Sequence, residues 1–215
     1  FTGFTAPETG EKTIIKLNAN INDIHRAVFL YQSDEDSLPA GGYNRFSSNW
    51  VYYAPEIERN SITLYSDWND RLSTKVRYST YEYLSDPYSP GLTIPEMTIY
   101  VGEDSIRLGG ERYRAANKIE TSSDYISFKA TYDLGNHVVT AGIDIEDTSL
   151  YNLFISRYNG EVRFNSIADY EAGEYSYLRA HVPQGGILEV DPVAANFNLE
   201  KTTLYIGDKI YLGDL

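Results

Sequence analysis

Apolar and polar residues alternate from Tyr125 to Glu146, which is the period of a half-buried β-strand. Gly135-Asn136 in the middle accepts the positive φ of a tight turn and predicts a hairpin. On one face the predicted pairs are all apolar: Tyr132 with Val139, Ala130 with Ala141, Phe128 with Ile143 and Ile126 with Ile145. On the other face they are Asp133 with Val138, Thr131 with Thr140, Lys129 with Gly142 and Ser127 with Asp144. A slip of one residue would mix the faces, so the pattern specifies the register.

Two further hairpins follow from the same pattern. Asn22-Asp23 predicts a two-residue turn between 13–21 and 24–32. The resulting pairs are Ile15 with Leu30, Leu17 with Val28 and Ala19 with Arg26, with Lys16 and Asn18 on the opposite face. A three-residue loop at Asn69-Asp70-Arg71 keeps apolar residues together. It pairs Trp68 with Leu72, Leu64 with Val76 and Ile62 with Tyr78, while Asp67, Tyr65 and Thr63 face Ser73, Lys75 and Arg77.

The remaining segments complete a meander of strands. We expect one long strand over 45–68 with a bulge at Pro55, a short ribbon over 97–108, and a strand over 196–206 that ends in a turn at Gly207-Asp208. A short helix near 165–172 is predicted, with Asn165 or Ser166 as N-cap, Asp169 in its first turn and Gly173 as C-cap. Short turns therefore alternate with long loops at 33–44, 85–122 and 147–194. This asymmetry is typical of outer-membrane barrels and gives seven full crossings plus the start of an eighth at Ile210.

Composition agrees with a membrane barrel. No apolar run approaches the roughly 18 residues of a membrane helix, whereas barrel strands need only about 10 residues each. The chain has 20 Tyr against 8 Phe and 2 Trp, which suits a surface needing rings with one wet end. The net charge of −13 argues against nucleic-acid binding, and the lack of Cys excludes disulfide scaffolds, thiol catalysis and Cys-ligated zinc. Because the chain starts at Phe1 without a signal peptide, either its N-terminus was processed or it is a piece of a larger protein, and we expect the second.

No catalytic motif is present: Gly-rich phosphate loops, HExxH and GxSxG are all missing, so we expect no enzyme, cofactor or resident metal. Four weaker candidates each have a simpler structural explanation as polar strand ends, solvated loops or strand surfaces. They are His25, His137 and His181 as metal or proton-transfer residues; Asp34, Glu35 and Asp36 as calcium ligands; Tyr43, Trp50, Tyr52 and Tyr53 as stacking rings for a sugar; and Arg112, Arg114 and Lys118 as a basic cluster for an anionic ligand or lipopolysaccharide.

The segments 100–122 and 128–173 resemble the barrel of TonB-dependent outer-membrane receptors, specifically the Oar-like group, and 21–32 and 62–79 are similar to earlier hairpins of that barrel. The matching residues are Asn117, Tyr132, Gly135, His137, Thr140, Gly142, Tyr151, Asn152, Phe154, Gly160, Phe164, Ile167, Asp169 and Gly173. The resemblance implies a large Gram-negative outer-membrane barrel, closed by a plug, that imports scarce nutrients with energy delivered through TonB. It carries over no catalytic residue, and the ligand-binding residues are unknown.

The sequence therefore predicts an all-β, antiparallel up-and-down meander in which residues 1–215 form one partial barrel domain without a plug. Eight strands cannot close a barrel of about 22, so the chain would be a sector of the wall. Its expected partners are membrane lipid, lipopolysaccharide, a nutrient ligand and, through parts outside this chain, the TonB complex. The alternatives are a soluble or surface β-sandwich or propeller that binds glycans, which would bury the apolar face under a second sheet, and a plug-free porin.

Overall fold

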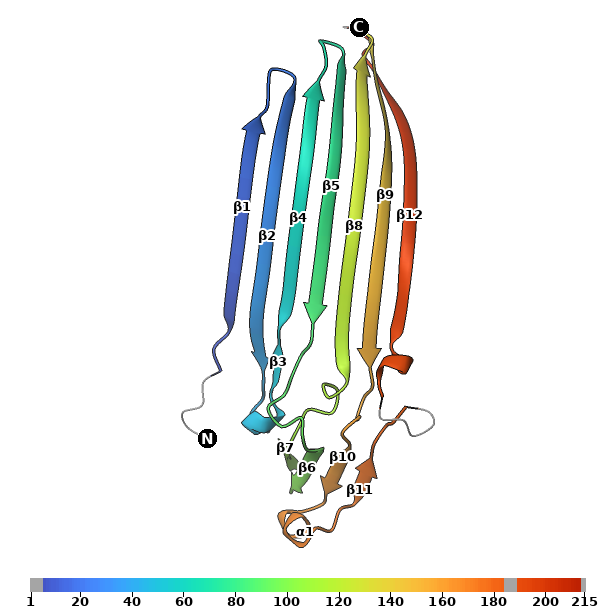
Figure 1. The fold of residues 1–215 in the computed structure, drawn as a ribbon. Coiled ribbons are helices and arrows are strands. Elements are labelled where there is room, and N and C mark those ends of the chain that lie inside the picture. Colours follow the sequence, from blue (N-terminus) through green and yellow to red (C-terminus); the bar gives the residue numbers. More distant parts are fainter. Residues whose placement is uncertain (1–5, 184–188, 214–215) are drawn as a thin grey trace.

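Seven long strands form one antiparallel sheet in strict sequence order (Figure 1). The structure is a computed structural model that describes residues 6–183 and 189–213. The strands of this sheet are β1 (Thr9–Asn20), β2 (His25–Ala40), β4 (Pro55–Asp67), β5 (Leu72–Ser85), β8 (Asn117–Asp133), β9 (His137–Phe154) and β12 (Ala195–Ile210), and the short β3 (Val51–Tyr53) pairs with the end of β2. The predicted up-and-down meander is confirmed, with as many long strands as the seven full crossings that were expected.

The central hairpin has the predicted register. Tyr132 faces Val139 and Phe128 faces Ile143, and all the remaining predicted pairs between β8 and β9 are also observed. The turn closes where Leu134 N–H donates to the His137 carbonyl at 2.8 Å, and Gly135 has φ 88°. The β4–β5 pairing is likewise confirmed, with a three-residue loop that sets Leu64 opposite Val76.

The first hairpin differs from the prediction by one residue. Ile15 faces Tyr31 and Leu17 faces Phe29, whereas Leu30 and Val28 had been expected opposite them. The reason lies in the turn, because the Asn22 side chain accepts hydrogen bonds from the backbone N–H groups of Ile24 and His25 and the loop spans four residues. Lys16 and Asn18 keep their predicted face.

Several predicted segment boundaries are wrong. β8 begins at Asn117, inside the loop predicted over 85–122, and β9 continues to Phe154, inside the loop predicted over 147–194, because the two strands pair along their whole length. The acidic segment from Ser33 was expected to be a loop, but β2 continues to Ala40 because β1 and β4 pair with its acidic part and β3 pairs with its last three residues. The single strand predicted over 45–68 is instead a 3-10 helix at Ser47–Asn49 followed by β3 and β4, which are separated at Ala54. The turn predicted at Gly207-Asp208 is absent, and β12 runs on to Ile210 along β9, so no eighth crossing starts there.

The long connections fold into a second body at one end of the sheet, which we call the loop module (residues 41–54, 86–116 and 155–183). It contains a small sheet in the order β11-β10-β6-β7, in which β6 and β10 run parallel. Its strands are β6 (Glu96–Val101), β7 (Asp104–Leu108), β10 (Glu161–Phe164) and β11 (Tyr177–Arg179). The predicted ribbon over 97–108 is β6 and β7, and the predicted helix is α1 (Ile167–Ala172), capped by Ser166 and by Gly173 with φ 72°.

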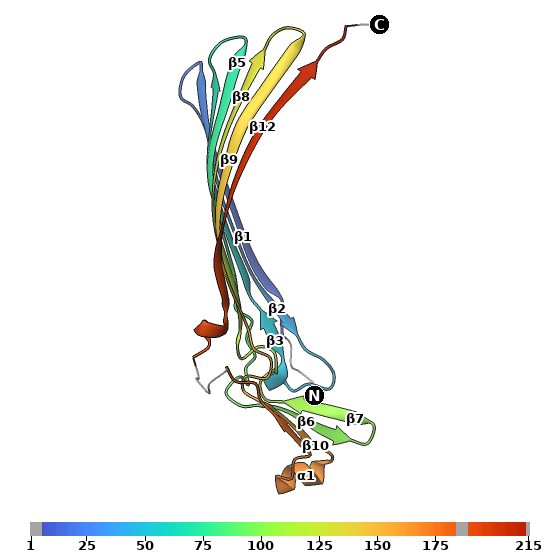
Figure 2. The ribbon, with the colours of Figure 1, turned by 90° about the vertical axis from the view of Figure 1, so that its right-hand side faces the viewer.

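The hydrophobic core lies in and beside the loop module. The buried apolar side chains of the described chain are Val51, Ile99, Ala116, Leu153 and Phe164. The large sheet is one curved layer seen edge-on (Figure 2). A 3-10 helix at Asp191–Val193 leads into β12, and part of the loop predicted over 182–191 lies outside the described residues. No helix among the described residues is long and apolar enough to cross a membrane.

Candidate functional site

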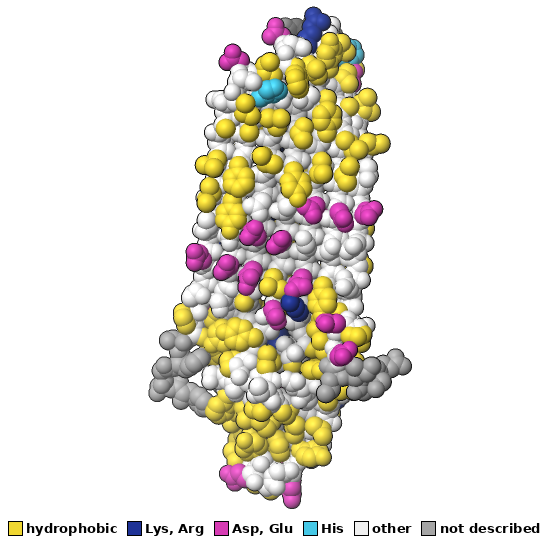
Figure 3. All heavy atoms as spheres, in the orientation of Figure 1, with side chains coloured by type: hydrophobic (Ala, Val, Ile, Leu, Met, Phe, Trp, Pro, Cys, Tyr) yellow, Lys and Arg dark blue, Asp and Glu magenta, His cyan; other side chains and the backbone are white. Residues whose placement is uncertain are grey.

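One face of the large sheet, which we call the outer face, presents an uncovered apolar band next to the hairpin turns (Figure 3). Phe128 is 42% exposed and Ile145 is 44% exposed, although both lie in the middle of the sheet. Within the described chain no second sheet covers these residues, in contrast to what a β-sandwich predicts. A contiguous apolar surface of this kind indicates a membrane or protein partner.

A row of carboxylates borders the apolar band on the side of the loop module (Figure 3). We call it the acidic belt: Glu11, Glu35, Glu56, Glu58, Glu82, Glu120, Asp124, Asp147 and Glu200. Several members face one another directly across neighbouring strands, since Asp147 lies opposite both Asp124 and Glu200. Like charges opposite each other destabilise a sheet, and water must solvate them. The apolar band therefore ends at this belt.

Neutralising one member of the acidic belt should raise stability. In Asp147→Asn, the repulsion with Asp124 and Glu200 is removed, so we expect a higher melting temperature at low salt and a smaller gain at high salt, where exposed charges are screened. Circular dichroism melting of both proteins at two salt concentrations measures this. An equal melting temperature at low salt would contradict the account.

The opposite face, here the inner face, is polar beside the hairpin turns. It carries Lys16, Asn18, Ser127, Lys129 and Thr131, as the alternation predicted. Ser127 donates a hydrogen bond of 2.6 Å to Asp144, and Thr131 pairs with Thr140 at 3.3 Å. The sheet thus has one apolar face and one polar face, which is the arrangement of a barrel wall.

The three histidines do not come together. Near the hairpin turns, His25 Nδ1 lies 2.8 Å from Ser66 Oγ and its ring meets Trp68 edge to face, while His137 Nδ1 lies 2.6 Å from the Asp208 carboxylate. His181 contacts Ser156 in the loop module. Each has an ordinary local partner, and no group of three or more metal-binding side chains occurs among the described residues.

The acidic candidate residues are not a calcium-binding loop. Asp34, Glu35 and Asp36 lie in β2, so successive side chains point to opposite faces of the sheet. Lys12 lies 3.7 Å from Asp34 and 3.9 Å from Asp36 on the inner side. The cluster expected from the sequence is divided by the strand.

The four aromatic candidates divide into two pairs. Tyr52 stacks on Tyr88 with ring centroids 5.1 Å apart, and Tyr53 stacks against the Arg114 guanidinium, so both have partners within the protein. Tyr43, which is 97% exposed, and Trp50, whose ring N–H donates to the Arg45 carbonyl at 3.3 Å, border a hollow of about 560 Å³. Trp50 lies so close to Gly41 that a Cβ there would come within 2.2 Å of its ring. Of the four aromatic candidates, Tyr43 and Trp50 are the two that border this hollow.

The predicted basic cluster is dispersed. Arg112 is nearly buried between two glutamates, Arg114 lies 3.6 Å from Glu111, and Lys118 pairs with Glu120 at 2.5 Å. These side chains contact three separate sets of partners, so they do not form a common anion site.

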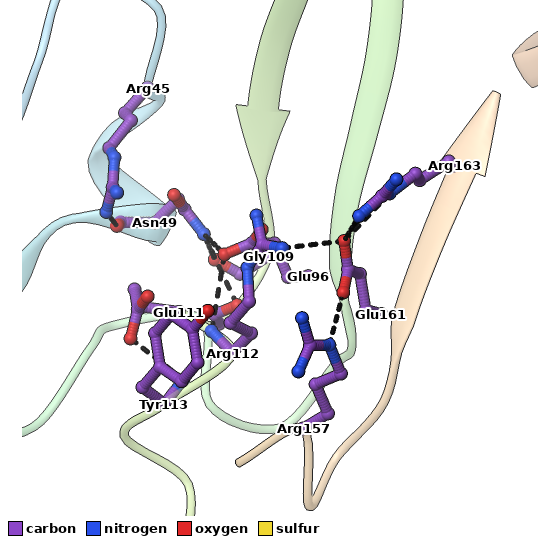
Figure 4. A network of polar contacts seen from close by, with 11 residues as sticks. Arg45, Asn49, Glu96, Gly109, Glu111, Arg112, Tyr113, Arg157, Glu161 and Arg163 are labelled. Atoms are coloured by element: carbon purple, nitrogen blue, oxygen red, sulfur yellow. Dashed lines mark hydrogen bonds and ion pairs between the residues drawn. The ribbon is translucent and has the colours of Figure 1, made fainter. Parts of the chain in front are cut away.

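A buried ionic network at the centre of the loop module was not predicted (Figure 4). Glu96 and Glu161 lie directly opposite each other on the parallel strands β6 and β10, and both side chains are fully buried. Arg112 bridges them, with its two terminal nitrogens 2.5 Å from Glu96 Oε1 and 2.7 Å from Glu161 Oε1. Arg112 offsets the repulsion between the two carboxylates, and the charge-assisted contacts hold three segments of the chain together.

Two further arginines complete the surroundings of Glu161. Arg157 Nε donates to Glu161 Oε2 at 2.5 Å, and Arg163 donates to Oε1 at 2.8 and 2.9 Å. Arg157 has φ 58°, a left-handed conformation that costs about 1 kcal/mol or more in a non-glycine residue. Buried Asn49 donates to Glu96 and to the Gly109 carbonyl, which ties the 3-10 helix to the same network.

The pKa values of two carboxyl groups in the loop module, Glu161 and Glu111, are shifted in opposite directions. Burial alone would raise the pKa of Glu161, but hydrogen bonds from Arg157 and Arg163 and the charges of Arg112 and Arg163 outweigh it and hold this pKa below its ordinary value. Burial raises the pKa of Glu111, and the charge of nearby Glu96 adds to the effect despite a hydrogen bond from Tyr113 N–H. Glu161 is therefore the charged centre of the module.

Acidification should loosen the loop module. A lowered folded-state pKa means that Glu161 contributes stability above its unfolded pKa of about 4.3 and loses it as the pH falls through the lower folded-state value. The raised pKa of Glu111 has the opposite effect, because its protonation at low pH favours the folded module. We expect the near-ultraviolet tyrosine signal to be steady above about pH 5 and to fall below about pH 4. Glu161→Gln should show the lowered tyrosine signal already at neutral pH and no further acid step, whereas the half-exposed Glu120→Gln should keep the step.

Comparison with known proteins supports the fold only. No protein-family model matches the chain, and no curated protein matches it. Among solved structures, the chain is similar to the outer membrane transporter YddB from Escherichia coli, with a TM-score of 0.63 and 8% sequence identity. The match covers 95% of this chain and 25% of YddB, so the chain spans a quarter of that protein's length. The chain has the fold of a segment of an outer-membrane transporter barrel.

Proposed function

We propose that this chain is a section of the wall of a TonB-dependent outer-membrane receptor of the Oar-like type, which takes up a nutrient ligand with energy delivered through TonB. The observation that carries the proposal is the uncovered apolar band on one face of a sheet whose opposite face is polar. Its fold likeness to a segment of the outer membrane transporter YddB supports the barrel-wall part of the proposal. Lipid covers the apolar band, and the barrel lumen lies on the inner face.

The two ends of the sheet have different tasks in this proposal. The loop module lies outside the cell and captures ligand beside Tyr43 and Trp50, with its segments held in place by the network around Glu161. The acidic belt lies above the lipid tails, at the level of lipopolysaccharide head groups. The ligand then passes along a polar lumen, whose lining is contributed in this section by Lys16, Asn18, Ser127, Lys129 and Thr131. Plug movement and TonB contact belong to other parts of the protein.

A pair of adjacent cysteine variants tests which face meets lipid. The chain has no native Cys, so Phe128→Cys on the outer face and Ser127→Cys on the inner face each provide one reporter thiol. In outer-membrane fragments, a membrane-impermeant maleimide should label Ser127→Cys and leave Phe128→Cys unlabelled until detergent is added. Tyr43→Cys, at a position with 97% side-chain exposure, is the positive control. Equal labelling at 127 and 128 without detergent would refute the barrel-wall assignment.

Energised uptake needs its own test. The longer protein should bind the purified periplasmic domain of TonB, and cells lacking TonB should lose the growth benefit that the protein gives on its nutrient. If growth is the same with and without TonB, a plug-free porin, which shares this wall, becomes the better assignment.

A further inference from the structure

A row of cationic and aromatic side chains crosses the inner face near the hairpin turns. Arg26 on β2 faces Tyr65 on β4, which faces Lys75 on β5, which faces Lys129 on β8. Because directly opposed residues of neighbouring strands point to the same side, these four side chains share the face of Ser127 and Thr131. We call this set the cationic row.

The positive charges of the cationic row converge. The Arg26 guanidinium carbon lies 4.5 Å from the centroid of the Tyr65 ring, and Lys75 Nζ lies 5.6 Å from the same centroid. Lys129 is directly opposite Lys75 on the next strand, at a strand spacing of about 4.8 Å. Three cations therefore lie within three strand spacings, where like charges repel unless an anion joins them.

Nearby carboxylates form no direct ion pair with the row. None of the ion pairs between described residues includes Arg26, Lys75 or Lys129. Asp144, on the same face, accepts the Ser127 hydroxyl at 2.6 Å, and the neighbouring Arg77 donates to Thr63 at 3.1 Å. Asp144 lies diagonal to Lys129 and Asp67 diagonal to Lys75, but neither carboxylate forms a direct ion pair with the row, so its cations are open to a direct anionic partner.

A second ring borders the row at its far end. Lys129 faces Gly142, and Gly142 faces Tyr205 on β12. A Cβ at Gly142 would lie 2.4 Å from the Tyr205 ring and hydroxyl, so the missing side chain is what lets that ring lie across the strand beside Lys129. Tyrosine rings therefore accompany the cations at both Tyr65 and Tyr205 and add hydroxyl groups that can donate to an anion.

We propose that the cationic row binds a soluble multivalent anion carrying phosphate or carboxylate groups, an inference that rests on the proposed function only in placing this face in the lumen. The convergence of Arg26 and Lys75 on one ring favours a compact anion over the extended acidic surface of a polypeptide. In the proposed transporter this row contributes selectivity for anionic ligands, with the lysines as point charges and Arg26 as the planar donor.

The direct test of the row is to measure, by calorimetry, how tripolyphosphate binds to the full-length protein in detergent. We expect saturable binding that weakens about a hundredfold in the Lys75→Gln/Lys129→Gln variant, because two charge-assisted contacts are lost and each contributes roughly tenfold. Lys75→Arg/Lys129→Arg should keep most of the affinity. Arg59→Gln is the matched control, since Arg59 stacks on Tyr81 at 5.2 Å on the same face but outside the row.

Three results would overturn the proposal. They are an absence of saturable tripolyphosphate binding, equal weakening by Arg59→Gln, or binding of an acidic glutamate peptide alone, which would assign the row to a polypeptide partner. The measurement needs neither a membrane nor TonB. The maleimide or growth tests could therefore fail while tripolyphosphate binding still depends on Lys75 and Lys129. That outcome would refute the transporter function and keep the anion site.

Discussion

Replacing Glu161 by Gln is expected to unfold the loop module while the large sheet remains paired. The amide cannot neutralise Arg112, Arg157 and Arg163, which approach the buried carboxylate to within 2.5 to 2.8 Å. Removing one partner from a buried ionic group leaves uncompensated charge and costs about 3–5 kcal/mol. The left-handed conformation of Arg157, held in part by this contact, should relax at the same time.

Hydrogen exchange measured by mass spectrometry distinguishes the two bodies. Peptides from 96–116 and 155–179 should lose protection in Glu161→Gln, whereas the hairpin peptide 125–146 should keep it. Glu120→Gln is the control because Glu120 pairs with Lys118 at a half-exposed site, and such surface bridges contribute only about 0–1 kcal/mol. Unchanged protection of 155–179 in Glu161→Gln would show that the network does not hold the module together.

The sequence was sufficient where alternation was strict. Between Ile126 and Ile145 nearly every second residue is apolar, so only one register keeps the faces apart, and it is the one observed. Around β2 the run Val28-Phe29-Leu30 is apolar on both faces and leaves two registers nearly equal in pattern. The Asn22 side chain, which accepts two backbone hydrogen bonds in the turn, then decides the register. A local polar contact thus settles what the hydrophobic pattern leaves open.

The loop module could not be predicted in the same way. Its ionic network joins residues far apart in sequence, including Asn49, Glu96 and Glu161, and depends on the parallel pairing of β6 with β10. The available signal was small: Glu96 and Glu161 each begin a short apolar strand, after Pro95 and Gly160, where a buried charge requires a partner. That signal predicts that a cation is needed, but it does not identify Arg112, because hydrogen-bond geometry selects that residue only after the chain has folded.

Placing a charge on the lipid side should prevent stable insertion, whereas the same charge one residue away should not. Phe128 lies mid-way between the hairpin turn and the acidic belt and is 42% exposed on the outer face, so in the proposed barrel Phe128→Lys puts an ammonium among lipid tails. At the middle of the bilayer this costs about 2–4 kcal/mol for a barrel strand. Ser127→Lys, on the inner face, meets water and the carboxylate of Asp144, which at present accepts from Ser127.

Urea titration of the longer protein refolded into lipid vesicles measures this difference. We expect the unfolding midpoint to fall markedly for Phe128→Lys and to change little for Ser127→Lys. Refolding in detergent micelles should reduce the gap, because a micelle lets the lysine side chain reach water at lower cost. If both variants lost equal stability in vesicles, protein instead of lipid would have to cover the outer face. The cationic row would then no longer be placed in a lumen, although its affinity for tripolyphosphate could still be measured.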